Sequence, residues 1–220
     1  KPLYWGWCGD VFLFGSELKA LKAHPAFDAD VDRNALALLL RHNCIPAPHS
    51  IYADIFKLMP GHYLSLPLAD IAAAKVVKPV SYWCFNDVVE RGLAEPFGGN
   101  RSEGVDLLHD HLSRSIAGQM LSDVPLGAFL SGGVDSSTVV ALMQAQSSQK
   151  VRTFTIGFDQ DGYNEAAHAK AVAQHLGTDH TELYVSSQDA LDVIPRLPSM
   201  YCEPFSDSSQ IPTFLVSQMA

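Results

Sequence analysis

The sequence predicts an α/β protein in which a mainly β segment precedes a domain built on a parallel sheet. Short apolar stretches separated by Gly and Pro fill the first part of the chain. The second part instead alternates strand patterns with helical ones, which implies parallel strands with right-handed crossovers. The pair Gly132-Gly133 stands between an apolar strand and an apolar helix of this second part.

The composition limits the kinds of partner. A hydrophobic share of 47% with 18% charged residues over 220 residues is typical of a globular protein with a buried core. The net charge of −9 disfavours nucleic-acid and membrane-surface roles, because phosphate backbones and anionic headgroups repel such a chain. We therefore expect no nucleic-acid partner and no membrane partner.

The cysteines and the first residues suggest the setting. Cys8, Cys44, Cys84 and Cys202 lie far apart without paired spacing, so neither a zinc site nor a disulfide framework is predicted, and free thiols in a cytoplasmic protein fit best. No run of 18 apolar residues occurs and no secretory signal opens the chain. Since no initiator Met is present, we expect a piece of a longer polypeptide.

The first predicted elements are a hairpin and two helices. The turn pair Gly9-Asp10 separates strands Leu3–Trp7 and Val11–Phe14. Ser16 is the predicted N-cap of a helix over Glu17–Ala23. A second helix fits Asp32–His42, and its predicted apolar face consists of Leu36, Leu39 and Leu40.

Strands should then dominate up to a loose stretch. Pro60-Gly61 marks a turn before an extended Tyr63–Leu66, and Val80–Phe85 reads as a further extended piece. Residues 92–100 are rich in Gly and interrupted by Pro, which predicts a linker. We place the domain boundary there, with one domain over residues 1–95 and another over residues 96–220.

The second domain is predicted to open with an amphipathic helix. Glu103–Leu121 carries Val105, Leu108, Leu112, Ile116 and Met120 at spacings of three and four, with Ser102 as N-cap and a sheet as the expected partner. The elements expected after it are strand Leu126–Leu130, helix Ser136–Gln146, strand Val151–Phe158, helix Glu165–Leu176 closed by Gly177, strand His180–Val185, helix Gln188–Met200 and a helix from near Pro212.

The chemistry is predicted at Ser131–Ser137. A strand, a glycine pair and a helix N-terminus bind phosphate, because free amides and the positive end of the helix dipole converge there. Gly132 and Gly133 allow close approach of the backbone, while Ser131, Ser136 and Ser137 add hydroxyl donors.

The kind of phosphate chemistry follows from what the loop lacks. No Lys follows the glycines, so the loop is not a Walker A motif and transfer of a γ-phosphoryl group is disfavoured. A serine-rich loop with one carboxylate suits pyrophosphate as a leaving group, with Asp135 holding Mg²⁺. Attack would then fall on the α-phosphorus of ATP and yield an acyl-adenylate. The simpler alternative is a plain turn followed by an N-cap.

The chain resembles the glutamine-hydrolysing asparagine synthetases and related amidotransferases over nearly its whole length. The segments that carry the resemblance in the second part are Ser122–Ser137, Thr153–Phe158, His175–His180 and Glu203–Thr213. Those that resemble the end of the glutaminase domain are Lys1–Tyr4, Ser16–Leu21, Lys57–Leu64 and Tyr82-Trp83. Tyr163-Asn164-Glu165 departs mildly from a common Asp-Glu pair.

The resemblance implies both folds and ligands. The first domain would be the C-terminal part of an N-terminal-nucleophile glutaminase of four-layer αββα architecture, and the second an ATP pyrophosphatase domain of the adenine nucleotide α-hydrolase type. The implied ligands are ATP, Mg²⁺, glutamine and a carboxylate acceptor, expected to be aspartate, and a homodimer is left open. The implied nucleotide-site residues are Phe129, Leu130, Ser131, Gly132, Gly133, Val134, Asp135, Ser136, Ser137 and Ile156. The implied acceptor-side residues are Glu203, Asp207, Ser208 and Ser209.

The resemblance also implies what the chain should lack. The family's glutaminase nucleophile is a cysteine at the mature N-terminus, and its second ATP-site motif would lie beyond Ala220. We therefore expect no glutaminase catalytic residue within the chain, Cys8 as a packed strand residue, and no complete reaction by this piece alone.

Several alternatives stay open. The acceptor can be a sugar acid or another carboxylate, or the enzyme can close a ring as β-lactam synthetases do. A tRNA-modifying ATP pyrophosphatase would share the loop but need a basic face, which the acidic balance disfavours. A non-catalytic nucleotide-binding relative is the third class.

Overall fold

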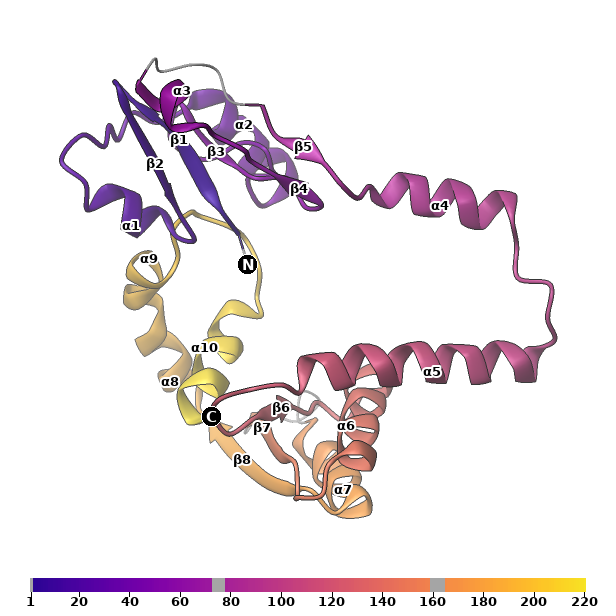
Figure 1. Ribbon diagram of the computed structural model, residues 1–220. Helices are drawn as coiled ribbons and strands as arrows, with labels where there is room; N and C mark the ends of the chain where they lie inside the picture. Colours follow the sequence, from indigo (N-terminus) through magenta and orange to yellow (C-terminus); the bar gives the residue numbers. More distant parts are fainter. Residues whose placement is uncertain (1, 73–77, 159–164) are drawn as a thin grey trace. The chain divides into compact units, whose positions relative to one another are not determined.

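The computed structural model describes residues 2–72, 78–158 and 165–220 (Figure 1). The chain folds into two compact units, one of residues 1–96 with 195–207 and one of residues 97–194 with 208–220. The domain boundary expected after residue 95 stays a prediction. Residues 195–207, which that prediction assigned to the second domain, fold with the first unit.

The first unit is built on a three-stranded antiparallel sheet of order β2-β1-β3. Its strands are β1 (Tyr4–Cys8), β2 (Val11–Gly15) and β3 (Ile55–Lys57), so the predicted hairpin is confirmed. Tyr4 and Cys8 point into the core with Leu18 and Leu21 of helix α1 (Leu18–Lys22). Cys8 is therefore a packed strand residue, as expected. Ser16 is not the cap, because the helix begins after Glu17, which makes no side-chain capping bond.

Helix α2 (Arg33–His42) begins where predicted, because the Asp32 carboxylate accepts a hydrogen bond from Asn34 N at 2.8 Å. Its predicted apolar face is wrong in part. Leu36 is 41% and Leu40 81% exposed, whereas Ala35 is fully buried and Leu39 packs on the core. The helix turns the Ala35 and Leu39 stripe inward, and the neighbouring stripe of the two leucines faces outward.

The strands expected after residue 60 are shorter than predicted. In the described part of this stretch, β4 (His62–Tyr63) pairs with β5 (Val80–Ser81), and helix α3 (Leu68–Ala72) lies between them in sequence. The extended piece predicted over Val80–Phe85 holds for strand β5 and for Cys84, whose backbone is extended, and it ends one residue early because helix α4 (Phe85–Ala94) begins at Phe85. The linker predicted over residues 92–100 starts too early, because Gly92, Leu93 and Ala94 belong to α4. The apolar residues of α4 recur at helical spacing.

The second unit contains the predicted parallel sheet, of order β6-β7-β8. The strands are β6 (Gly127–Phe129), β7 (Arg152–Phe158) and β8 (Asp179–Val185). Helices α6 (Val134–Gln146) and α7 (Ala166–Leu176) follow β6 and β7. Gly177 closes α7 at a φ of +72°, as expected for a left-handed C-terminal residue. The core joins Leu130 and Val140 to Ala169 and Ala173.

The first helix of this unit departs from prediction in its cap and its partner. Helix α5 spans Arg101–Gln119 and is capped by Asn100 with Glu103 in a capping box, so the prediction of Ser102 is wrong. Its main neighbour is α6 rather than the sheet, and Val105 and Leu108 are each 58% exposed.

The predicted helix Gln188–Met200 is wrong as one element. It is divided into α8 (Ser187–Val193), a 3₁₀ turn η1 (Ile194–Arg196) and α9 (Leu197–Met200). Pro195 has no N–H to continue the α-helical ladder, which accounts for the break. Helix α10 (Gln210–Met219) ends the chain, close to where the sequence placed it. No helix among the described residues is long and apolar enough to cross a membrane.

A buried polar network joins β7 to β8. The Thr153 hydroxyl, fully buried, lies 2.9 Å from Thr178 Oγ1 and 2.9 Å from His180 Nδ1. His180 Nε2 is buried with no hydrogen-bond partner in the described part of the chain. Burial disfavours the imidazolium and lowers the pKa of His180 below its usual value.

This network predicts a loss of stability on mild acidification. An unfolded histidine protonates near pH ~6.5. The folded form stays neutral to lower pH, so the unfolded chain binds more protons and the free energy of unfolding falls as pH falls through this window. We expect His180→Gln to lose less stability than wild type between about pH 7 and about pH 5, measured by urea denaturation. Equal losses in the two proteins would contradict this account.

Candidate functional site

The site begins where β6 ends. Phe129 is the last β6 residue paired with β7, opposite Phe154. The next residue, Leu130, is buried and its N–H donates to Phe154 O at 2.9 Å. The chain then turns through Ser131 and Gly132 into Gly133, the N-cap of α6. The predicted strand, loop and helix therefore occur in the predicted order.

Gly132 brings this loop against α7. Its φ of +78° is left-handed, a region that favours glycine. A Cβ at this position would lie 2.7 Å from Ala169 N and 2.9 Å from the carbonyl carbon of His168. No side chain fits there without moving backbone. The loop thus lies directly on the opening turn of α7, and the N-termini of α6 and α7 are neighbours.

Hydroxyl groups hold the loop in shape. Ser131 N donates to Ser136 Oγ at 3.3 Å, and the two serine hydroxyls lie 3.0 Å apart. Gly133 N donates to Ser131 Oγ at 3.3 Å. Ser137 Oγ is buried and has no hydrogen-bond partner among the described residues. The loop is therefore organised by its own serines.

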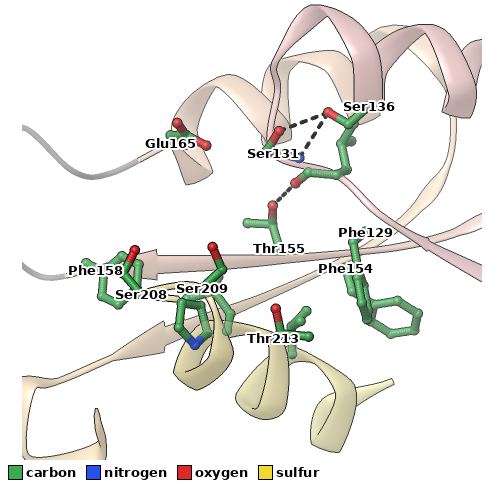
Figure 2. Close-up of a pocket in the computed structure, with 14 residues that line it drawn as sticks. Phe129, Ser131, Ser136, Phe154, Thr155, Phe158, Glu165, Ser208, Ser209 and Thr213 are labelled. Carbon is green, nitrogen blue, oxygen red and sulfur yellow. Dashed lines mark hydrogen bonds between the residues drawn. The ribbon is translucent and has the colours of Figure 1, made fainter. Parts of the chain in front are cut away.

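A cavity of about 700 Å³ opens beside this loop. Figure 2 shows Ser131 and Ser136 on the side of α6 and α7, and Ser208, Ser209 and Thr213 across from them at the start of α10. The lining residues are Phe129, Leu130, Ser131, Ser136, Phe154, Thr155, Ile156, Phe158, Glu165, Ser208, Ser209, Pro212, Thr213 and Val216. The cavity lies at the carboxyl ends of β6 and β7, the edge at which open α/β sheets bind ligands.

Half of these lining residues were predicted as site residues. The cavity brings together Phe129, Leu130, Ser131, Ser136, Ile156, Ser208 and Ser209. The remaining predicted residues do not line the cavity; they are Gly132, Gly133, Val134, Asp135, Ser137, Glu203 and Asp207. Asp135 lies exposed in the first turn of α6, so its expected metal role stays a prediction.

The lining residues that sequence reasoning missed come mostly from β7 and α10. Thr213 and Val216 lie three residues apart in α10, so the helix predicted from near Pro212 carried a signal for them. Thr155 is buried and donates its hydroxyl to Leu130 O, which locks the start of the loop to β7. Glu165 is the N-cap residue of α7. The sequence showed it only within Tyr163-Asn164-Glu165, the segment that departs from a common Asp-Glu pair, and predicted no site role for it.

Ile156 presents backbone groups to the cavity. Phe154 O accepts from Leu130 N, so the polar backbone groups of Phe154 face β6. In a parallel ladder, alternate residues face the same neighbour, which directs the N–H and C=O of Ile156 to that side as well. The last β6 pairing is at Phe129, so these groups lie beyond the end of β6. They can recognise a planar hydrogen-bonding ligand.

Glu203 lies in the first unit and is held by groups of that unit. Its carboxylate accepts from Tyr4 Oη at 3.1 Å and from Ile51 N at 2.7 Å, and it forms an ion pair with Lys57. Its side chain is only 9% exposed. Burial and this carboxylate raise the pKa of Tyr4 well above its usual value. The expectation that Glu203 contacts an acceptor remains untested, and its visible role is to anchor its own segment.

We expect Glu203→Gln to destabilise the first unit strongly. The change leaves the Lys57 ammonium, whose side chain is 15% exposed, without its carboxylate. Breaking a buried pair in this way costs about 3 kcal/mol, measurable by urea denaturation. The matched control is Glu17→Gln, because the Glu17–Lys19 pair is exposed at 3.2 Å and should cost below about 0.5 kcal/mol. A similar small loss in both variants would refute the anchoring role.

Comparison with known proteins assigns the chain to a family. Residues 107–220 match the asparagine synthase family, and residues 1–83 match the glutamine amidotransferase domain. A putative glutamine-hydrolysing asparagine synthetase of Methanocaldococcus jannaschii is 35% identical over all of this chain and 41% of the relative.

More distant relatives carry the same name. Asparagine synthetase 1 of Bacillus subtilis is 29% identical over all of this chain and 33% of the relative. The human asparagine synthetase is 28% identical over 72% of this chain and 29% of the relative. The chain thus spans less than half the length of these curated relatives. Because the asparagine synthase match covers more than half of its residues, the chain belongs to the asparagine synthase family.

Proposed function

We propose that this chain is part of an ATP-dependent ligase that forms an amide from a carboxylate, aspartate first, and ammonia released from glutamine. The observation that carries the proposal is the hydroxyl-lined cavity at the carboxyl ends of β6 and β7, where the loop of Ser131–Ser137 meets α6 and α7. The order of a glutamine amidotransferase match and an asparagine synthase match on one chain supports the source of ammonia.

The cavity suits an adenine nucleotide whose phosphates lie at the loop and whose base lies near Phe129 and Ile156. The loop amides, the serine hydroxyls and the helix N-termini would hold the pyrophosphate part of ATP. Phe129 would border the base, and the N–H and C=O of Ile156 would read its hydrogen-bonding edge. A volume of about 700 Å³ lies in the range of pockets that enclose such ligands.

Mg²⁺ fits the donor set of this region. Asp135 in the first turn of α6 and the hydroxyls of Ser131 and Ser136 are oxygen ligands of the kind that Mg²⁺ prefers. No group of three or more His, Cys, Asp or Glu side chains in the described ranges could hold a metal alone. The residues that would hold Mg²⁺ are therefore Asp135, Ser131 and Ser136, and the chemistry that it would supply is neutralisation of charge on the leaving pyrophosphate.

The proposed reaction has two steps. An oxygen of the acceptor carboxylate attacks the α-phosphorus of ATP, and pyrophosphate leaves with the bonding electrons into the loop. Ammonia then attacks the acyl carbon, and AMP leaves with the acceptor oxygen. Ser208 and Ser209, which line the cavity across from the loop, would contact the acceptor, and Asp207 precedes them. The neutral donors of the loop stabilise the leaving charge.

The proposed architecture follows the two matches. We assign the first unit to the C-terminal part of a four-layer αββα glutaminase and the second to an ATP pyrophosphatase domain of the adenine nucleotide α-hydrolase type. Cys8 is buried in β1 and packs in the core, which does not suit a nucleophile. Among the described residues we therefore assign no glutaminase catalytic group.

The loop geometry predicts the effect of Gly132→Ala. The new Cβ would meet Ala169 N at 2.7 Å, so the loop must leave α7 and ATP affinity should fall at least about tenfold, measured by calorimetry. The matched control is Gly177→Ala, which has a similar φ of +72° but open space around it. That variant should lose about 1 kcal/mol of stability and keep its ATP affinity. Equal affinities of both variants for ATP would contradict the proposed pyrophosphate site.

Isotope transfer tests the acyl-adenylate. A protein that contains this chain, supplied with ATP, ammonium and aspartate labelled with ¹⁸O in its side-chain carboxylate, should release AMP that carries one labelled oxygen, detected by mass spectrometry. Pyrophosphate should be unlabelled. Release of ADP with labelled phosphate would instead show an acyl-phosphate and refute the mechanism. If labelled AMP forms from a ¹⁸O-labelled sugar acid but not from labelled aspartate, the mechanism stands and only the identity of the acceptor changes.

A further inference from the structure

Glu165 is the one charged side chain among the described residues that line the nucleotide cavity. The remaining lining groups are aromatic, aliphatic or hydroxyl side chains, and no Lys, Arg or His is among them. A carboxylate without a cation is an unexpected feature in a cavity proposed to bind a nucleotide with about four negative charges. Its presence calls for a physical reason.

Glu165 lies at the phosphate end of the cavity. It is the N-cap residue of α7, and its backbone carbonyl accepts from Ala169 N at 3.0 Å. Ala169 N is also the atom nearest to the Cβ position of Gly132. Glu165 therefore lies within one helical turn of the loop. Figure 2 shows its carboxylate on the same side of the cavity as Ser131.

Within the described ranges, the fold makes no use of this carboxylate. Glu165 makes no side-chain capping bond to α7, and no ion pair joins it to another described residue. By contrast, Asn100 and Ser186 cap their helices with side-chain oxygens. Capping therefore does not explain the position of this side chain.

Charge decides what Glu165 can bind. A carboxylate beside bare phosphates is repelled, since unit charges a few ångströms apart interact by about 1 kcal/mol even in water. A divalent cation between them turns the repulsion into attraction. Mg²⁺ in nucleotide sites is usually held by one or two carboxylates together with substrate phosphates. Glu165 supplies a carboxylate on the cavity wall, which Asp135 does not.

We propose that Glu165 is a ligand, direct or through water, of the divalent cation that accompanies the nucleotide, and that it makes nucleotide binding cation-dependent. The proposal rests on the proposed nucleotide site. It adds Glu165 as a metal-binding residue to the expected Asp135.

The test compares ATP binding with and without Mg²⁺ in Glu165→Gln, which removes the charge and keeps the shape. In wild type, Mg²⁺ should tighten ATP binding relative to an EDTA buffer, measured by calorimetry. In the variant, binding in EDTA should become tighter and binding in Mg²⁺ weaker, each by about fivefold. Glu165→Asp should keep part of the cation dependence. Mn²⁺ titrations followed by electron paramagnetic resonance in the presence of ATP should show weaker Mn²⁺ binding in Glu165→Gln.

The control is Asp179→Asn, which removes an exposed carboxylate of the same unit at the opposite, amino end of β8. It should leave the ratio of the two affinities unchanged. An unchanged ratio in Glu165→Gln would overturn the proposal. If Glu165→Gln leaves the ratio of the ATP affinities in Mg²⁺ and EDTA unchanged but no longer discriminates between ATP and 2′-deoxyATP, the proposal is overturned and Glu165 contacts the ribose instead. Absence of ATP binding by wild type would instead refute the nucleotide site itself.

Discussion

The close approach of Gly132 to the first turn of α7 is the constraint on which the site depends. A left-handed backbone without a side chain lets the loop touch Ala169 N, and this contact fixes α6 and α7 next to each other. Helices that follow parallel strands begin at the same edge of the sheet. The contact of Gly132 with α7 additionally brings the N-termini of α6 and α7 next to each other. The serine hydrogen bonds and the Thr155 bond to Leu130 O then hold the loop in that position.

The early end of β6 determines which backbone groups are exposed at the other end of the cavity. Because β6 pairs with β7 only as far as Phe129, the backbone of Ile156 lies beyond it, on the side that β6 has left. A longer β6 would have used those groups for the sheet. The turn at Ser131 therefore has two effects, since it starts the loop that we propose to bind phosphate and it exposes a hydrogen-bonding edge of β7.

Local signals in the sequence were sufficient for the sheet and the loop. The alternation of strand and helix patterns predicted β6 to β8, and Gly177 predicted the end of α7. Features that depend on distant residues could not be predicted. Residues of α10 line the cavity because the chain returns to the sheet after 195–207, and no local pattern encodes that return.

Apolar periodicity was less reliable for helix faces than for helix positions. Three leucines in α2 predicted a buried stripe, yet the core accepts Ala35 and Leu39 and leaves Leu40 exposed. A hydrophobic pattern states which residues can be buried, whereas the space between elements decides which of them are. The same reasoning applies to Glu203, whose carboxylate suggested a substrate contact. Its partners Tyr4, Ile51 and Lys57 lie more than a hundred residues away in sequence, where no motif could show them.

The charge of the cavity is set by helix N-termini, hydroxyl groups and one carboxylate. Three helices of 13, 11 and 10 residues begin at or next to it, with Gly133, Glu165 and Ser209 as their N-caps. Helix N-termini and hydroxyls supply partial positive charges, each equivalent to about half a charge at most. Such donors orient phosphate oxygens but do not balance a full polyanion, and Glu165 makes the balance more negative. Under the proposed function, a cavity of this kind would discriminate against free nucleotide and favour a nucleotide that arrives with its own cation. The same weak, neutral donors would then release pyrophosphate once it has left the α-phosphorus, whereas a cluster of lysines would retain it.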